Sequence, residues 1–169
     1  MVILAAHAGY RAEAWESFAV AEVGAAAALA GLLVVAASIN IARIVELPAI
    51  VKRLGATLAL FTGILIVGSL LLVPDQDHRL LGAEIAVLGV ALATVVYSRR
   101  GHQTTEPEYR RRALVVAGLG VLAALLIAIG GVGYATASIG GLYWLVPGVL
   151  LGFSIGLVNA WVAMVEILR

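Results

Sequence analysis

Five long runs of apolar residues constrain the fold of this chain more than any other feature of its sequence. A helix needs about 20 apolar residues to cross the ~30 Å hydrocarbon core of a bilayer. The runs cover residues 18–41, 54–73, 80–97, 113–134 and 142–165. They do not alternate between apolar and polar residues, as the strands of a membrane barrel do. Because backbone groups in lipid must bond within their own segment, the runs predict five transmembrane helices.

The composition excludes most other classes of protein. Hydrophobic residues make up 63% of the chain and charged residues 12%, whereas a soluble domain has about 45–50% and about 25%. This excludes disorder and a nucleic-acid-binding domain, and the net charge of +1 does not suggest an acidic partner. We predict one all-helical membrane domain over residues 1–169, embedded in a lipid bilayer. Residues 1–17 precede the first run, and we expect them to fray.

The basic residues are distributed unevenly between the two sides of the predicted bundle. The connections after the first and third runs, together with the C-terminus, share one side and hold nine of the 11 Lys and Arg residues. The opposite side holds only Arg11 and Arg79. The positive-inside rule places basic loops in the cytoplasm. We therefore predict an outside N-terminus and a cytoplasmic C-terminus. The basic connection over residues 98–112 sets this topology, and it could also bind anionic lipid.

Small residues on the predicted helices indicate close helix packing, because lipid tails are as apolar as leucine and do not drive helices together. The fifth run carries the most regular pattern, with small residues four apart at Gly148, Gly152, Gly156 and Ala160. This face packs either against another helix of the same chain or against a second copy. The first and third runs carry similar sets, namely Gly24, Ala28 and Gly31, and Gly82, Ala86, Gly89 and Ala93. We predict a tight bundle that forms a homo-oligomer.

Two acidic residues lie within the apolar runs, where ionisable groups are costly and suggest function. Glu22 and Glu84 each lie a few residues inside a run that begins on the outer side. Two close carboxylates can share a proton or hold a cation, and His78 lies at the same surface. These three residues form a candidate ion or proton site. Alternatively, each glutamate only stabilises the positive N-terminal end of its helix.

The remaining polar residues suggest structural roles. We expect Asn40 and Asn159, which lie inside predicted helices, to bond across to neighbouring helices. Alternatively, they line a pore or a substrate path. Glu166 lies near the C-terminus and is most simply solvated. The chain has no cysteine, its histidines do not cluster, and no metal-ligand spacing such as HExxH occurs. We therefore expect no catalytic residues, no metal, no cofactor and no enzymatic activity.

The first two runs resemble a group of small bacterial membrane proteins. The resemblance is carried by Ala21-Glu22-Val23-Gly24-Ala25, Ser38-Ile39-Asn40-Ile41, and Leu47-Pro48. Many of those proteins carry the label "modulator of FtsH protease", and others are uncharacterised. The resemblance implies a multi-pass protein of the bacterial inner membrane and no catalytic residue.

Two functions remain open at this point. The first is an oligomeric ion channel or small carrier with Glu22 and Glu84 in an acidic outer vestibule. The alternative is a regulatory or scaffolding subunit of another membrane protein, such as a membrane-bound protease. A channel needs polar or wettable groups along its axis. An axis lined only by leucine, valine and glycine favours the subunit.

The predicted orientation is testable by cysteine labelling, since the natural chain has no cysteine. Asp77→Cys and Gln103→Cys lie in connections that we place on opposite sides of the membrane. We expect a membrane-impermeant maleimide to label Asp77→Cys in intact cells and Gln103→Cys only after permeabilisation. Labelling of both positions from the same side would refute the topology.

Overall fold

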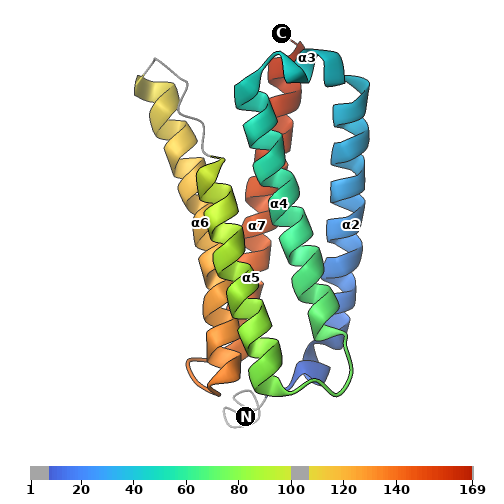
Figure 1. The fold of residues 1–169 in the computed structure, drawn as a ribbon, viewed down its shortest axis with the longest axis vertical. Coiled ribbons are helices and arrows are strands. Elements are labelled where there is room, and N and C mark those ends of the chain that lie inside the picture. Colours follow the sequence, from blue (N-terminus) through green and yellow to red (C-terminus); the bar gives the residue numbers. More distant parts are fainter. Residues whose placement is uncertain (1–7, 100–106, 169) are drawn as a thin grey trace.

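The computed structural model describes residues 8–99 and 107–168, and the described parts are helical without strands. Five long helices run from end to end (Figure 1), and each is long and apolar enough to cross a membrane. They are α2 (Glu16–Ile39), α4 (Pro48–Leu71), α5 (His78–Ser98), α6 (Pro107–Ala135) and α7 (Leu145–Leu168). Short helices η1 (Ala12–Trp15), α3 (Ile41–Val45) and η2 (Gly141–Trp144) precede α2, α4 and α7. The predicted five-helix fold is confirmed.

The two ends of the bundle differ in chemistry. One end carries α3 and the C-terminus of α7 (Figure 1). We term it the basic end, because Arg43, Lys52, Arg53 and Arg99 lie there. The other end carries η1 and η2, and we term it the aromatic end after Trp15, Tyr134, Tyr143 and Trp144. α4 begins at Pro48, six residues before the predicted run, because proline suits the first turn of a helix.

Four of the helices close into a ring. α4, α5, α6 and α7 contact one another in this order, and α7 returns to α4. α2 lies outside the ring and packs against α4. Toward the basic end, one apolar cluster joins α2, α4 and α7 and includes Leu33, Phe61 and Ala163. α4 is therefore the central helix and is the most buried of the five.

The interior of the ring is apolar. One cluster of buried side chains joins all four helices, with Leu60 from α4, Ile85 from α5, Ile127 from α6 and Ile155 from α7 among its members. In the part of the chain that the structure describes, Thr57 is the one fully buried polar side chain apart from tyrosine and tryptophan. Its hydroxyl donates to the carbonyl oxygen of Arg53, one turn earlier in α4, at 3.1 Å. No polar path therefore runs through the described interior of one copy.

α5 and α6 approach so closely that their backbones touch. A Cβ atom built on Gly89 would lie 2.5 Å from the backbone nitrogen of Ala128. A Cβ atom on Gly82 would lie 2.6 Å from the backbone nitrogen of Ala135. Such distances leave no room for any side chain. The small residues predicted on the third run therefore form the contact between α5 and α6.

The glycine face of α7 is used inside the chain, which decides between the two alternatives left open by the sequence. Gly148 faces the carbonyl oxygen of Ala123 in α6, and Gly156 faces the ring of Phe61 in α4. Gly152 lies between them against Ile64 of α4, and Ala160 packs against the cluster near Leu33. This face gives no support to a homo-oligomer, which stays a prediction.

The segment before α2 is folded from residue 8 onward, so the expectation that it frays is wrong there. The carbonyl oxygen of Gly9 accepts a hydrogen bond from the backbone nitrogen of Leu142 at 2.9 Å. The hydroxyl of Tyr10 accepts one from the backbone nitrogen of Gly140 at 3.0 Å. Trp15 packs edge-on against Tyr143, with ring centroids 5.1 Å apart. Residues 1–7 lie outside the described ranges.

The glycine contacts predict unequal effects of one substitution. Gly89→Leu places a side chain against the backbone of α6 and should lower the free energy of unfolding by at least about 1–3 kcal/mol. Gly31→Leu is the matched control, because nothing lies within 4 Å of a Cβ atom built there. We expect Gly31→Leu to leave stability unchanged or slightly raised, since leucine favours helix over glycine. Thermal unfolding in detergent, followed by circular dichroism, measures both. Equal losses would contradict the packing described here.

Candidate functional site

The two intramembrane glutamates lie near the aromatic end, as the sequence predicts. Glu22 lies in the second turn of α2 and Glu84 in the second turn of α5, and both side chains are half-buried. The structure gives the two carboxylates different surroundings, which the sequence did not distinguish.

Glu84 has a hydrogen-bond partner from the connection between α4 and α5. The side-chain amide nitrogen of Gln76 donates to Oε2 of Glu84 at 3.3 Å. The other polar atom of that amide, Gln76 Oε1, is buried without a hydrogen-bond partner. Gln76 was not among the predicted site residues, because a glutamine in a polar connection carries no sequence signal that it turns back onto a helix. The contact ties the connection to α5.

Glu22 has no comparable partner among the described residues. Its Oε2 atom is buried and accepts no hydrogen bond from any of them. The next residue, Val23, packs against Gly68 of α4, so this turn of α2 lies at the contact between the two helices. A buried carboxyl oxygen without a partner is costly. Glu22 is therefore the stronger of the two candidates for a group that binds or exchanges something.

The described residues do not join Glu22 and Glu84 through any hydrogen bond given by the structure, so the paired carboxylate site stays a prediction. Within residues 8–99 and 107–168, no three His, Asp or Glu side chains gather closely enough to hold a metal ion. His78 is exposed at the start of α5. The carboxylate of Asp77 caps that helix, accepting from the backbone nitrogens of Arg79 and Leu80 at 2.9 and 3.1 Å. Those hydrogen bonds, chiefly the one from Leu80, lower the pKa of Asp77.

The two intramembrane asparagines have different surroundings. Asn40 does not make the predicted bond to a neighbouring helix. Its side-chain nitrogen donates to the carbonyl oxygen of Ala36 at 3.2 Å, one turn earlier, because α2 ends at this point and leaves carbonyl groups free. Asn159 lies half-buried in α7, and its cross-helix bond stays a prediction.

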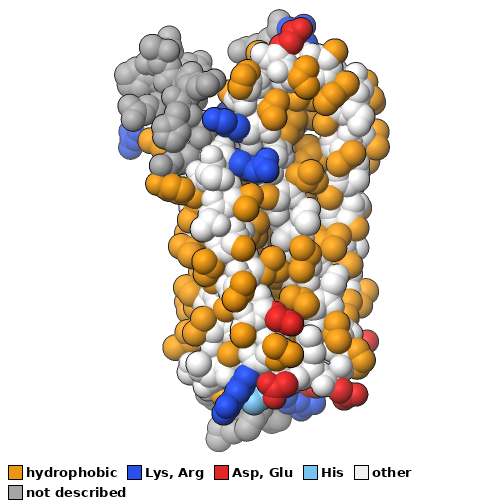
Figure 2. All heavy atoms as spheres, in the orientation of Figure 1, with side chains coloured by type: hydrophobic (Ala, Val, Ile, Leu, Met, Phe, Trp, Pro, Cys, Tyr) orange, Lys and Arg blue, Asp and Glu red, His pale blue; other side chains and the backbone are white. Residues whose placement is uncertain are grey.

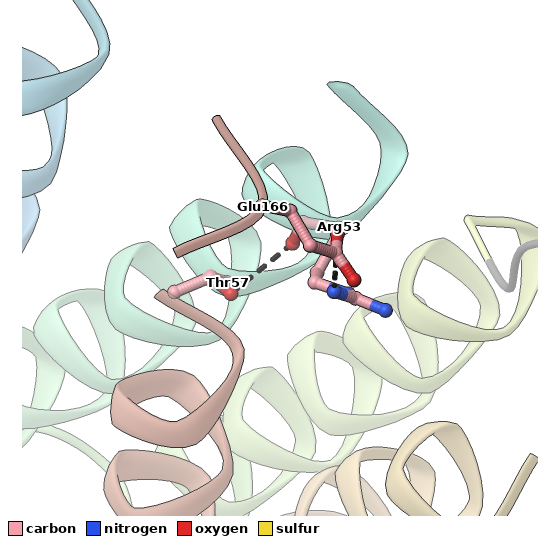
Figure 3. A network of polar contacts seen from close by, with 3 residues as sticks. All are labelled: Arg53, Thr57 and Glu166. Carbon is pink, nitrogen blue, oxygen red and sulfur yellow. Dashed lines mark hydrogen bonds and ion pairs between the residues drawn. The ribbon is translucent and has the colours of Figure 1, made fainter. Parts of the chain in front are cut away.

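An ion pair links α4 to α7 at the basic end, as Figure 3 shows. Nη1 of Arg53 in α4 donates to Oε2 of Glu166 in α7 at 2.9 Å. Glu166 is therefore not simply solvated as expected. The sequence could not show this pair, since 113 positions separate the two residues. Because both side chains are partly exposed, the pair contributes at most about 1 kcal/mol, and its main effect is to align the ends of α4 and α7.

The different surroundings of the two glutamates predict opposite effects of one substitution. Glu22→Met removes a buried oxygen without a partner and should raise the free energy of unfolding by roughly 1–3 kcal/mol. Glu84→Met, the matched variant, removes the acceptor of Gln76 and should lower it by about 0.5–1.5 kcal/mol. Equilibrium unfolding in detergent measures both. A larger loss for Glu22→Met would contradict the absence of a partner for Glu22 within the chain.

Comparisons with known proteins add no assignment to this description. Protein-family models, curated proteins and solved structures give no significant match to the chain. The resemblance to small bacterial membrane proteins therefore stays a prediction.

Proposed function

We propose that this multi-pass membrane protein is a non-enzymatic regulatory or scaffolding subunit, which packs helix α2 against another membrane protein. The observation that carries the proposal is that the small residues of α2 are open, whereas those of α5 and α7 are used within the chain. The five apolar helices support a multi-pass membrane protein.

One side of α2 packs onto α4 and the rest of the helix is exposed. Ala19, Ala26 and Leu33 are buried, but a Cβ atom on Gly24 or Gly31 would meet nothing within 4 Å. Glycine inside a helix costs about 1 kcal/mol relative to alanine. In α5 and α7 the glycines allow close packing that offsets this cost. Because none of the described residues packs on Gly24 or Gly31, a helix of another protein would offset the cost in α2, since small residues allow helices to approach closely in lipid.

The apolar interior favours this proposal over the channel. A conducting path needs wettable groups along its axis, and the described interior of the ring is lined by side chains such as Leu60 and Ile127. A channel or small carrier would therefore have to form between copies. The unpartnered carboxyl oxygen of Glu22 keeps that function as the second candidate, because an ion at an interface between copies would supply the missing partner.

The predicted orientation and the resemblance suggest the kind of partner. With the aromatic end outside, Gly24 lies in the outer half of the membrane and Gly31 near its middle. The partner therefore contributes a transmembrane helix rather than a soluble domain. A membrane-bound protease is the candidate that the resemblance implies.

Photo-crosslinking from α2 tests the proposal, since the natural chain has no cysteine. Gly31→Cys carries a benzophenone maleimide on the open face, and Ala26→Cys, which is fully buried, is the matched control. In membranes of the native host we expect an adduct from position 31 that contains one copy of this chain and a different membrane protein. We expect little or no adduct from position 26.

Two results would overturn the proposal. An adduct of two copies of this chain, without another protein, would replace the partner by self-association. Ion flux in liposomes that Glu22→Gln combined with Glu84→Gln abolishes would establish the channel instead.

A further inference from the structure

The side chain of Arg99 crosses from α5 onto α4 at the basic end. Its guanidinium group occupies the space that a side chain at position 55 would take, with Nη1 and Cζ nearest to a Cβ atom built on Gly55. The guanidinium therefore lies directly over the backbone of α4. Gly55 makes this placement possible because it has no side chain.

A second basic side chain lies on the same face of α4. Lys52 precedes Gly55 by three residues, and residues with this spacing are neighbours on a helix surface. Among the described residues, neither Lys52 nor Arg99 forms an ion pair, and the acid at this end that does so, Glu166, is bonded to Arg53. Figure 2 shows basic side chains gathered over α4 and α5 near this end. Two positive charges thus share one surface, and no described acidic side chain forms an ion pair with either of them.

The helix itself adds to this positive potential. α4 begins at Pro48, and the backbone nitrogens of Ile50 and Val51 donate to the carbonyl oxygen of Leu47. Lys52 is the fifth residue of α4, so the partial positive charge of the helix N-terminus adds only weakly to the charge of the two side chains. Basic side chains are unfavourable at that position, and an anion is favourable. A bound anion would therefore offset chiefly the charges of Lys52 and Arg99.

We propose that Lys52 and Arg99 bind the phosphate group of an anionic phospholipid at the seam between α4 and α5. A guanidinium group matches two phosphate oxygens at once. This surface is independent of the open face of α2, and the inference does not depend on the proposed function.

The surface next to the two basic residues fits a lipid better than a free anion. From Gly55 toward the middle of the membrane, α4 continues the same face with Ala59, Thr62 and Ile66; Thr62 is exposed and Ile66 is 38% exposed. On α5, Val95 lies one turn before Arg99 and is also 38% exposed. Apart from Thr62 this seam is apolar, so an acyl chain can follow it while its headgroup phosphate stays at the basic end. A free phosphate ion would gain nothing from the seam.

Native mass spectrometry of the purified full chain tests the site, with phosphatidylglycerol as the anionic probe and phosphatidylcholine as the neutral one. We expect Lys52→Gln and Arg99→Gln each to weaken phosphatidylglycerol binding about fivefold, the usual effect of one basic residue near an anionic headgroup. Arg43→Gln is the matched control, because Arg43 is exposed on α3 at the same end. It should weaken binding clearly less.

Gly55→Leu is a second variant that keeps every charge. Its side chain displaces the Arg99 guanidinium from α4, so we expect weaker phosphatidylglycerol binding with phosphatidylcholine binding unchanged. Thermal unfolding shows whether the variant folds, and Gly55→Ala replaces it if it does not.

Three results would overturn the proposal. Equal losses of binding for Arg43→Gln and Arg99→Gln would mean diffuse electrostatic attraction without a site. Unchanged phosphatidylglycerol binding in the folded position-55 variant would show that the placement of the Arg99 guanidinium on α4 is not needed for binding. Full displacement of the lipid by inorganic phosphate would make the ligand a free anion.

Discussion

The backbone contact between α5 and α6 is the interaction on which the rest of the bundle depends. Lipid offers no hydrophobic force to gather helices, so stability has to come from close packing. Gly82 and Gly89 bring α5 against α6, and Gly148 and Gly156 bring α7 against α6 and α4. These contacts close the ring. Once it is closed, large apolar side chains such as Leu60 and Ile85 fill its interior.

The closed interior moves the functional question to the outer surfaces. The described interior of the ring is filled by apolar side chains and presents no polar path. Three features remain outside the packed core or at its edge: the open glycines of α2, the unpartnered oxygen of Glu22, and the basic pair of Lys52 and Arg99. The glycines of α2 suit contact with a helix of another protein. The carboxyl oxygen of Glu22 suits an ion or a proton, and Lys52 with Arg99 suits a phosphate group.

The sequence predicted the fold well and the candidate site only in part. The depth of Glu22 and Glu84 follows from their distance to the start of each apolar run, so both were placed near one end correctly. Their partners could not be predicted, because Gln76 reaches Glu84 only through the path of a connection. The same limit applies to Glu166, which meets Arg53 only because α4 and α7 lie side by side.

Hydropathy and helix length belong to single segments, so the sequence by itself determined five helices and the chemistry of the two ends. It also identified which helices carry small residues. Only the tertiary structure decided which of those residues are used. The glycines of α7 face α4 and α6, whereas a Cβ atom built on Gly24 or Gly31 of α2 meets no described residue within 4 Å. The physical reason is that packing depends on which helix faces meet. A periodic pattern along one helix does not specify where the neighbouring helices lie.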